Sequence, residues 1–70
     1  MNKQEWQKYF TENVIILKAQ GFFVEDIGRE YGPQFEGQYR WIGPNDLFQD
    51  GDVSYSEVDA WTECINANRI

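Results

Sequence analysis

Histidine is absent from this chain of 70 residues, and cysteine occurs only once. Without histidine, the chain lacks the commonest general base and a principal metal ligand. A single cysteine excludes a disulfide within the chain, which is typical of a reducing compartment. The sequence shows no basic-then-apolar leader and no apolar run near the ~20 residues that a membrane span requires. We therefore expect a cytoplasmic protein without a catalytic centre.

Basic residues are also missing from one part of the chain, because no Lys or Arg lies between Arg40 and Arg69. Elsewhere acids and bases balance, so the whole net charge of -6 lies in residues 46–63. A segment of this kind disfavours direct nucleic-acid binding, which needs positive charge against phosphate. It favours a basic protein surface or a cation as the partner. The six acids of this segment are Asp46, Asp50, Asp52, Glu57, Asp59 and Glu63.

Apolar residues make up 41% of the chain and aromatic residues 17%, which is enough for a folded protein. The length allows one small domain over residues 1–70. So short a chain has a small core, so we expect the Trp, Phe and Tyr side chains to supply much of its packing.

Two segments have the periodicity of amphipathic helices. The first covers residues 4–20 and ends at Gly21, a favoured residue after a helix C-terminus. The second covers residues 54–68. The apolar face of the first helix is predicted to comprise Trp6, Tyr9, Phe10, Val14, Ile16 and Leu17, and that of the second Tyr55, Val58, Trp61, Thr62 and Ile65.

Residues 22–31 and 35–42 are predicted strands, separated by the turn signal Gly32-Pro33. In the second strand apolar and polar residues alternate, as in a half-buried strand. The order helix, strand, strand, helix predicts an α+β domain with two layers, a helix–β-hairpin–helix arrangement. A third short strand near Val53 is an open alternative.

Residues 46–57 follow the spacing of a calcium-binding loop. Asp46, Asp50 and Glu57 occupy positions 1, 5 and 12, Gly51 occupies the turn position 6, and Phe48 replaces the usual oxygen donor at position 3. The segment resembles the loop of an EF-hand or dockerin module. The resemblance implies a calcium-binding or calcium-stabilised module whose metal ligands would be Asp46, Asp50, Asp52, Ser54 and Glu57.

The same residues have a structural explanation. Ser54 and Glu57 have the spacing of a capping box at the start of a helix, and Asp50-Gly51 is a common turn pair. The sequence therefore leaves open whether this segment binds calcium or is a turn followed by a helix cap.

The predicted second strand supplies another candidate surface. Tyr, Trp and Arg are the residues that dominate protein–protein interfaces. Tyr31, Tyr39, Arg40 and Trp41 are therefore candidate partner-binding residues, with core packing as the alternative for the aromatic rings. The surrounding charge is balanced, which disfavours a nucleic-acid stacking platform.

Catalytic candidates are few. Cys64 lies next to an acid and has no histidine to activate it, so we interpret it as a packing residue. Glu25 and Asp26 are adjacent carboxylates, which would point to opposite faces of a strand. We therefore expect no enzymatic activity and no cofactor, apart from calcium under the alternative interpretation.

In its size, acidity and lack of catalytic residues, the chain is similar in general character to small inhibitors of phages and mobile elements, such as anti-CRISPR and anti-restriction proteins. Immunity proteins and acidic antitoxin-like partners match these properties equally well. The similarity implies a non-enzymatic protein that blocks a basic surface of its partner, including a surface that binds nucleic acid. The acidic residues would steer the encounter and exposed aromatic residues would supply affinity.

Overall fold

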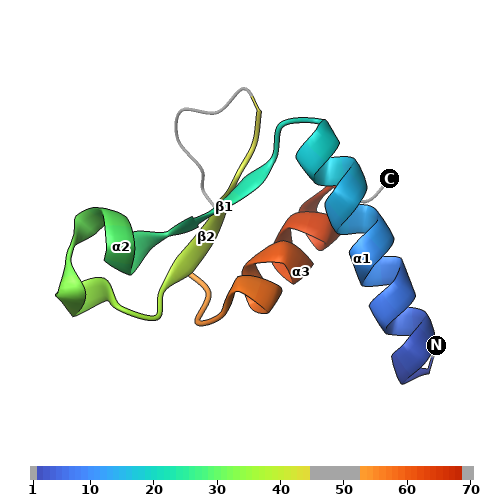
Figure 1. Cartoon of the computed structure of the whole chain (residues 1–70), viewed down its shortest axis with the longest axis horizontal. Helices are drawn as coiled ribbons and strands as arrows, with labels where there is room; N and C mark the ends of the chain where they lie inside the picture. Colours follow the sequence, from blue (N-terminus) through green and yellow to red (C-terminus); the bar gives the residue numbers. More distant parts are fainter. Residues whose placement is uncertain (1, 45–52, 69–70) are drawn as a thin grey trace.

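The computed structural model describes residues 2–44 and 53–68. These residues form an α+β fold of helix, antiparallel hairpin and helix, which confirms the predicted class. In Figure 1, α3 lies between the hairpin and α1, and α2 lies at the far end of the hairpin. The elements are α1 (Lys3–Ala19), β1 (Phe23–Asp26), α2 (Ile27–Tyr31), the 3-10 turn η1 (Pro33–Phe35), β2 (Tyr39–Ile42) and α3 (Glu57–Ala67).

Both ends of α1 are capped. The side chain of Asn2 accepts a hydrogen bond from the Glu5 amide at 2.9 Å. At the other end the amide of Phe22 donates to the Leu17 carbonyl at 3.0 Å, and Gly21 adopts φ 101°. This is a Schellman motif, which requires a residue with positive φ. The predicted end at Gly21 is therefore confirmed. None of the helices in the described residues has the length and apolar character needed to cross a membrane.

The hairpin is shorter than the sequence predicted. β1 and β2 pair antiparallel with Phe23 opposite Ile42 and Asp26 opposite Tyr39. Residues 27–31, predicted as strand, form α2, and residues 33–35 form η1. The prediction of two long strands with a turn at Gly32-Pro33 was therefore wrong in its boundaries.

Two local interactions account for the helical turn after β1. The Asp26 carboxylate caps α2 by accepting a hydrogen bond from the Arg29 amide at 3.2 Å. Gly28 lies so close to η1 that a Cβ atom would stand 2.6 Å from the Glu36 Cα. The missing Cβ at Gly28 permits α2 to pack this closely on the chain that follows it.

A further backbone pairing extends the hairpin on the outer side of β2. The amide of Tyr39 donates to the Ser54 carbonyl at 2.8 Å, and the amide of Ser54 donates to the Tyr39 carbonyl at 2.7 Å. The third strand considered near Val53 is thus present as a single bridge. This pairing holds Ser54 in an extended conformation, so α3 begins later than the predicted residue 54.

The N-cap of α3 is Ser56, whose side chain accepts a hydrogen bond from the Asp59 amide at 3.0 Å. The predicted capping box from Ser54 to Glu57 was wrong, because Ser54 is already engaged in the bridge to β2. The start of the helix is shifted to Glu57.

The core lies where α1, α3 and the hairpin meet. Its buried members come from α1 and α3, whereas the hairpin contributes half-buried Val24 and Trp41. Burial of these apolar groups is the main favourable term for so small a fold. The buried cluster comprises Leu17, Trp61, Cys64 and Ile65, with Tyr9, Phe10, Val14 and Phe22 packed against it.

Some residues predicted for the apolar faces are exposed instead. Ile16 is 53% exposed, and Tyr55 precedes the first residue of α3. Val58 lies in the first turn of α3 and is 56% exposed, and Trp6 is 37% exposed. The prediction of buried side chains at Trp6, Ile16, Tyr55 and Val58 was wrong, because a helix buries only the part of its apolar stripe that meets a neighbour.

Candidate protein-binding site

The N-terminal turn of α3 presents negative charge to solvent. Glu57 and Asp59 are both exposed and lie where carboxylates interact favourably with the helix dipole. Glu63, four residues after Asp59, is half-buried and accepts a hydrogen bond from the Ser54 hydroxyl at 2.9 Å. The other predicted acids, Asp46, Asp50 and Asp52, lie outside the described residues.

Two large apolar side chains are exposed next to these acids. Tyr55 is 77% exposed immediately before α3, and Val58 lies between Glu57 and Asp59 in the sequence. Exposed aromatic and aliphatic groups surrounded by polar groups are typical of protein-binding surfaces. Both residues were predicted to lie on the buried face of the second helix, so this prediction was wrong. The signal that could have identified them is Ser56 followed by Asp59, a second possible cap that begins the helix after Tyr55.

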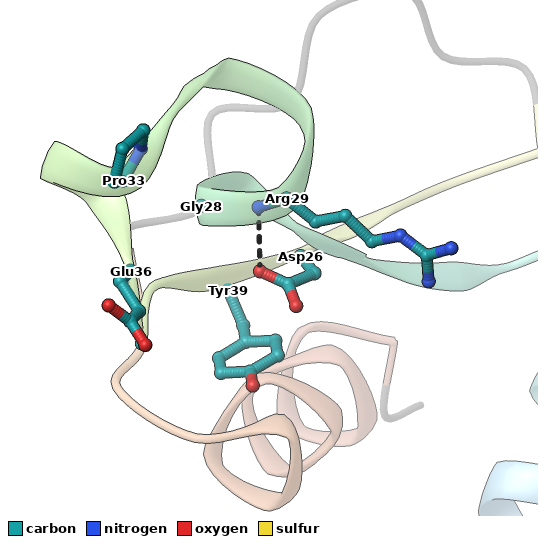
Figure 2. A pocket seen from close by; sticks show the side chains of 7 residues that line it. Asp26, Gly28, Arg29, Pro33, Glu36 and Tyr39 are labelled. Carbon is teal, nitrogen blue, oxygen red and sulfur yellow. Dashed lines mark hydrogen bonds between the residues drawn. The ribbon is translucent and has the colours of Figure 1, made fainter.

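The four predicted aromatic and arginine residues do not form one surface. Trp41 packs against the core, with its ring centroid 6.1 Å from that of Phe22. Tyr39 alternates with Arg40 along β2, and its ring points toward α3 in Figure 2. Tyr31 and Arg40 lie together, with the guanidinium carbon 6.0 Å from the centroid of the Tyr31 ring. The structure therefore separates Tyr31 and Arg40 from Tyr39 and Trp41.

Arg40 is engaged by neighbours within the chain. Its Nε donates to the Glu25 carboxylate at 2.8 Å across the two strands. The hydrogen bond to Glu25 raises the pKa of Arg40 above its ordinary value, against the opposing effect of burial. Together with the Tyr31 contact, this pairing fixes the guanidinium against the hairpin. A hollow beside it is lined by Ile27, Tyr31, Phe35, Gln38, Arg40 and Val53.

Adjacent carboxylates do not form an acid–base pair here. Glu25 is bound to Arg40, whereas Asp26 caps α2. Figure 2 shows Asp26 at the edge of a hollow that also includes Glu36 and Tyr39. Each of these two carboxylates therefore accepts a hydrogen bond that stabilises the fold.

Cys64 is fully buried in the core, as predicted for a packing residue. Burial raises the pKa of its thiol to about 11, although a hydrogen bond from Asn68 opposes this shift. A thiol that remains protonated at neutral pH is a poor nucleophile.

The calcium loop predicted from the sequence is only partly visible. Of its proposed ligands, Ser54 and Glu57 are described, whereas Asp46, Asp50 and Asp52 are not. The Ser54 hydroxyl donates to Glu63, and Glu57 begins α3. Within residues 2–44 and 53–68, no group of three potential ligands is placed to hold a metal ion. Calcium binding by this segment stays a prediction.

Comparison with known proteins gave no relative on which function could be based. No protein-family model, no curated protein sequence and no solved structure matches this chain. The functional assignment therefore depends on the surface of the molecule itself.

Proposed function

We propose that this protein is a non-enzymatic binding domain that occupies a basic surface of a partner protein, in the manner of the small acidic inhibitors. The observation that supports this function best is the first turn of α3. There Glu57, Val58 and Asp59 are all exposed, and the exposed side chain of Tyr55 lies immediately before the helix.

This combination provides the two contributions that an interface needs. Opposite charges accelerate association and select the partner, whereas buried apolar contacts supply most of the affinity. No Lys or Arg occurs between Arg40 and Arg69, so a basic partner meets no like charge from this segment. The non-enzymatic assignment is supported by Glu25, Asp26 and Cys64, whose side chains serve the fold.

The test begins with capture of the partner from a nuclease-treated lysate of the native host, followed by its identification by mass. The association rate of the purified pair is then measured between about 50 and about 500 mM NaCl. Because salt screens the steering charges, we expect the rate to fall by about tenfold or more.

The decisive variants are Glu57→Lys and Asp59→Lys, which reverse two exposed charges without touching the core. Both are expected to weaken binding. Glu12→Lys is the matched control, because Glu12 is an exposed acid on α1 outside the acidic segment. A partner whose affinity is unchanged by salt and by both α3 reversals would contradict the proposed function.

A further inference from the structure

A groove lies between the N-terminal part of α1 and the first turn of α3. Its apolar floor is formed by the side chains of Trp6, Phe10 and Val58. The two aromatic ring centroids lie 6.1 Å apart with an interplanar angle of 47°, so the rings pack against each other along α1. Polar side chains of α1 complete the lining, namely Lys3, Gln7 and Thr11.

The groove is open because the two helices meet over only part of their length. Every residue from Asn2 to Lys8 is exposed, and Leu17 is the buried residue of α1. Val58 lies one residue after the start of α3, so this helix does not extend far enough to cover the aromatic rings. Trp6 and Val58 therefore remain accessible at 37% and 56% exposure.

The charges beside the groove differ between its two walls. On the α3 wall the lining residue is Val58, and its neighbours in the sequence, Glu57 and Asp59, are both exposed beyond the lining. On the α1 wall the charged lining residue is Lys3. An occupant that complements both walls has an apolar group for the floor and positive charge directed toward α3. A second copy of the chain is disfavoured as occupant, because the net charge of each copy is -6.

We propose that this groove is the anchor site for the basic partner. A large aliphatic or aromatic side chain of the partner enters between Trp6, Phe10 and Val58, and a neighbouring Lys or Arg pairs with either Glu57 or Asp59, whose side chains leave α3 on different sides of Val58. This inference rests on the proposed function. It adds the place where the partner binds and the residue types, a large apolar residue near a Lys or Arg, that the partner contributes.

The test uses random peptides displayed on phage and selected against the immobilised full chain. Enriched peptides are expected to combine a large apolar residue with a nearby Lys or Arg. One enriched peptide is then synthesised and titrated into the protein. The indole N–H resonance of Trp6 is expected to shift, whereas that of buried Trp61 is expected to change little.

The matched variants are Val58→Ser and Ile15→Ser. Both replace an exposed β-branched aliphatic residue on a helix, with Ile15 62% exposed. Val58→Ser is expected to weaken peptide binding by about tenfold, the loss typical of removing one apolar contact in an interface. Ile15→Ser is expected to change it less than about twofold. A circular dichroism melt verifies that each variant is folded, and Trp6→Ala provides a second test from the α1 wall of the groove.

The possible failures are distinguishable. Basic peptides that need Glu57 and Asp59 but bind equally well to Val58→Ser would overturn the groove and leave the proposed function intact. Apolar peptides that ignore a Glu57→Gln, Asp59→Asn double variant would overturn both. A lack of any enriched peptide would also reject the anchor site. Concentration-dependent dimerisation that Val58→Ser abolishes would assign the groove to a second copy of the chain instead.

Discussion

The hydroxyl of Ser54 donates a hydrogen bond to Oε2 of Glu63 at 2.9 Å, which joins the residue paired with β2 to the middle of α3. Ser54 is the buried polar residue of the described chain, and Glu63 is half-buried. Removing the donor would leave a partly buried carboxylate without this partner. Ser54→Ala is therefore expected to lower the free energy of unfolding by about 1–3 kcal/mol.

Urea denaturation measures this change. Glu63→Gln is the informative comparison, because its amide oxygen still accepts a hydrogen bond from Ser54. We expect a smaller loss for Glu63→Gln than for Ser54→Ala. Equal stability of Ser54→Ala and the native protein would show that this hydrogen bond does not hold α3 against the hairpin.

Trp61 is the largest side chain of the buried cluster, with 4% exposure. Trp61→Ala is expected to cost about 3–5 kcal/mol, which is enough to unfold much of a population of so small a domain. Thermal melting checks this expectation. Tyr55→Ala is the control, because a side chain that is 77% exposed contributes little to the core. An unchanged melting temperature for Trp61→Ala would contradict the assignment of the core.

For Gly28→Ala, the structure predicts a loss of stability, whereas helix propensity alone predicts a gain. Alanine stabilises most helices relative to glycine, by about 1 kcal/mol. Here the added Cβ would lie 2.6 Å from the Glu36 Cα and 2.8 Å from the Phe35 carbonyl oxygen. Both atoms belong to the backbone, so relief requires η1 to move. Gly28→Ala is expected to destabilise the protein by about 1–3 kcal/mol, measured by chemical denaturation.

Gly37→Ala separates this steric effect from a backbone effect. Gly37 has φ 83°, but among the described residues, apart from its two chain neighbours, no heavy atom lies within 4 Å of the position that an added Cβ would take. Its expected cost is about 1 kcal/mol from conformational strain alone. Stabilisation by Gly28→Ala would show that α2 and η1 are not in close contact.

Because the Cys64 thiol is buried, we expect the protein to lose stability at high pH. Burial raises the thiol pKa from 9.0 to about 11, so the folded state binds this proton more tightly than the unfolded chain. The contribution is complete below the unfolded pKa and is lost as the pH rises from about 9 to about 11. The urea midpoint of the native protein is expected to fall more across this range than that of Cys64→Ala. Parallel pH profiles for the two proteins would contradict it.

The loop that resembles a calcium site predicts a separate response. If residues 46–57 bind Ca²⁺, adding the ion should raise the melting temperature through linkage, and Glu57→Gln should remove the increase. Mg²⁺ serves as the control for a general ionic effect. A melting temperature that does not change with millimolar Ca²⁺ would reject the calcium interpretation of these residues.

Local sequence determined several features of this protein. The Gly21 stop, the helical periodicity of α1 and α3 and the segregation of charge were all evident, because caps, periodicity and composition depend on nearby residues. The core positions Leu17, Trp61 and Ile65 followed from the same periodicity. The α+β class followed from the order of these elements.

Only the tertiary structure decided which residues of the predicted helices and strands are buried and which adopt an extended conformation. Ser54 could cap a helix by its sequence, but pairing with Tyr39 makes it extended and moves the cap to Ser56. Residues after Asp26 had strand character, yet they form α2, which is capped by the Asp26 side chain and packs closely on η1 at Gly28. Val58 fits the apolar stripe of α3, but α1 does not cover it. Burial depends on the length and angle of the neighbouring helix, which no local pattern contains, and the candidate groove is a consequence of that geometry.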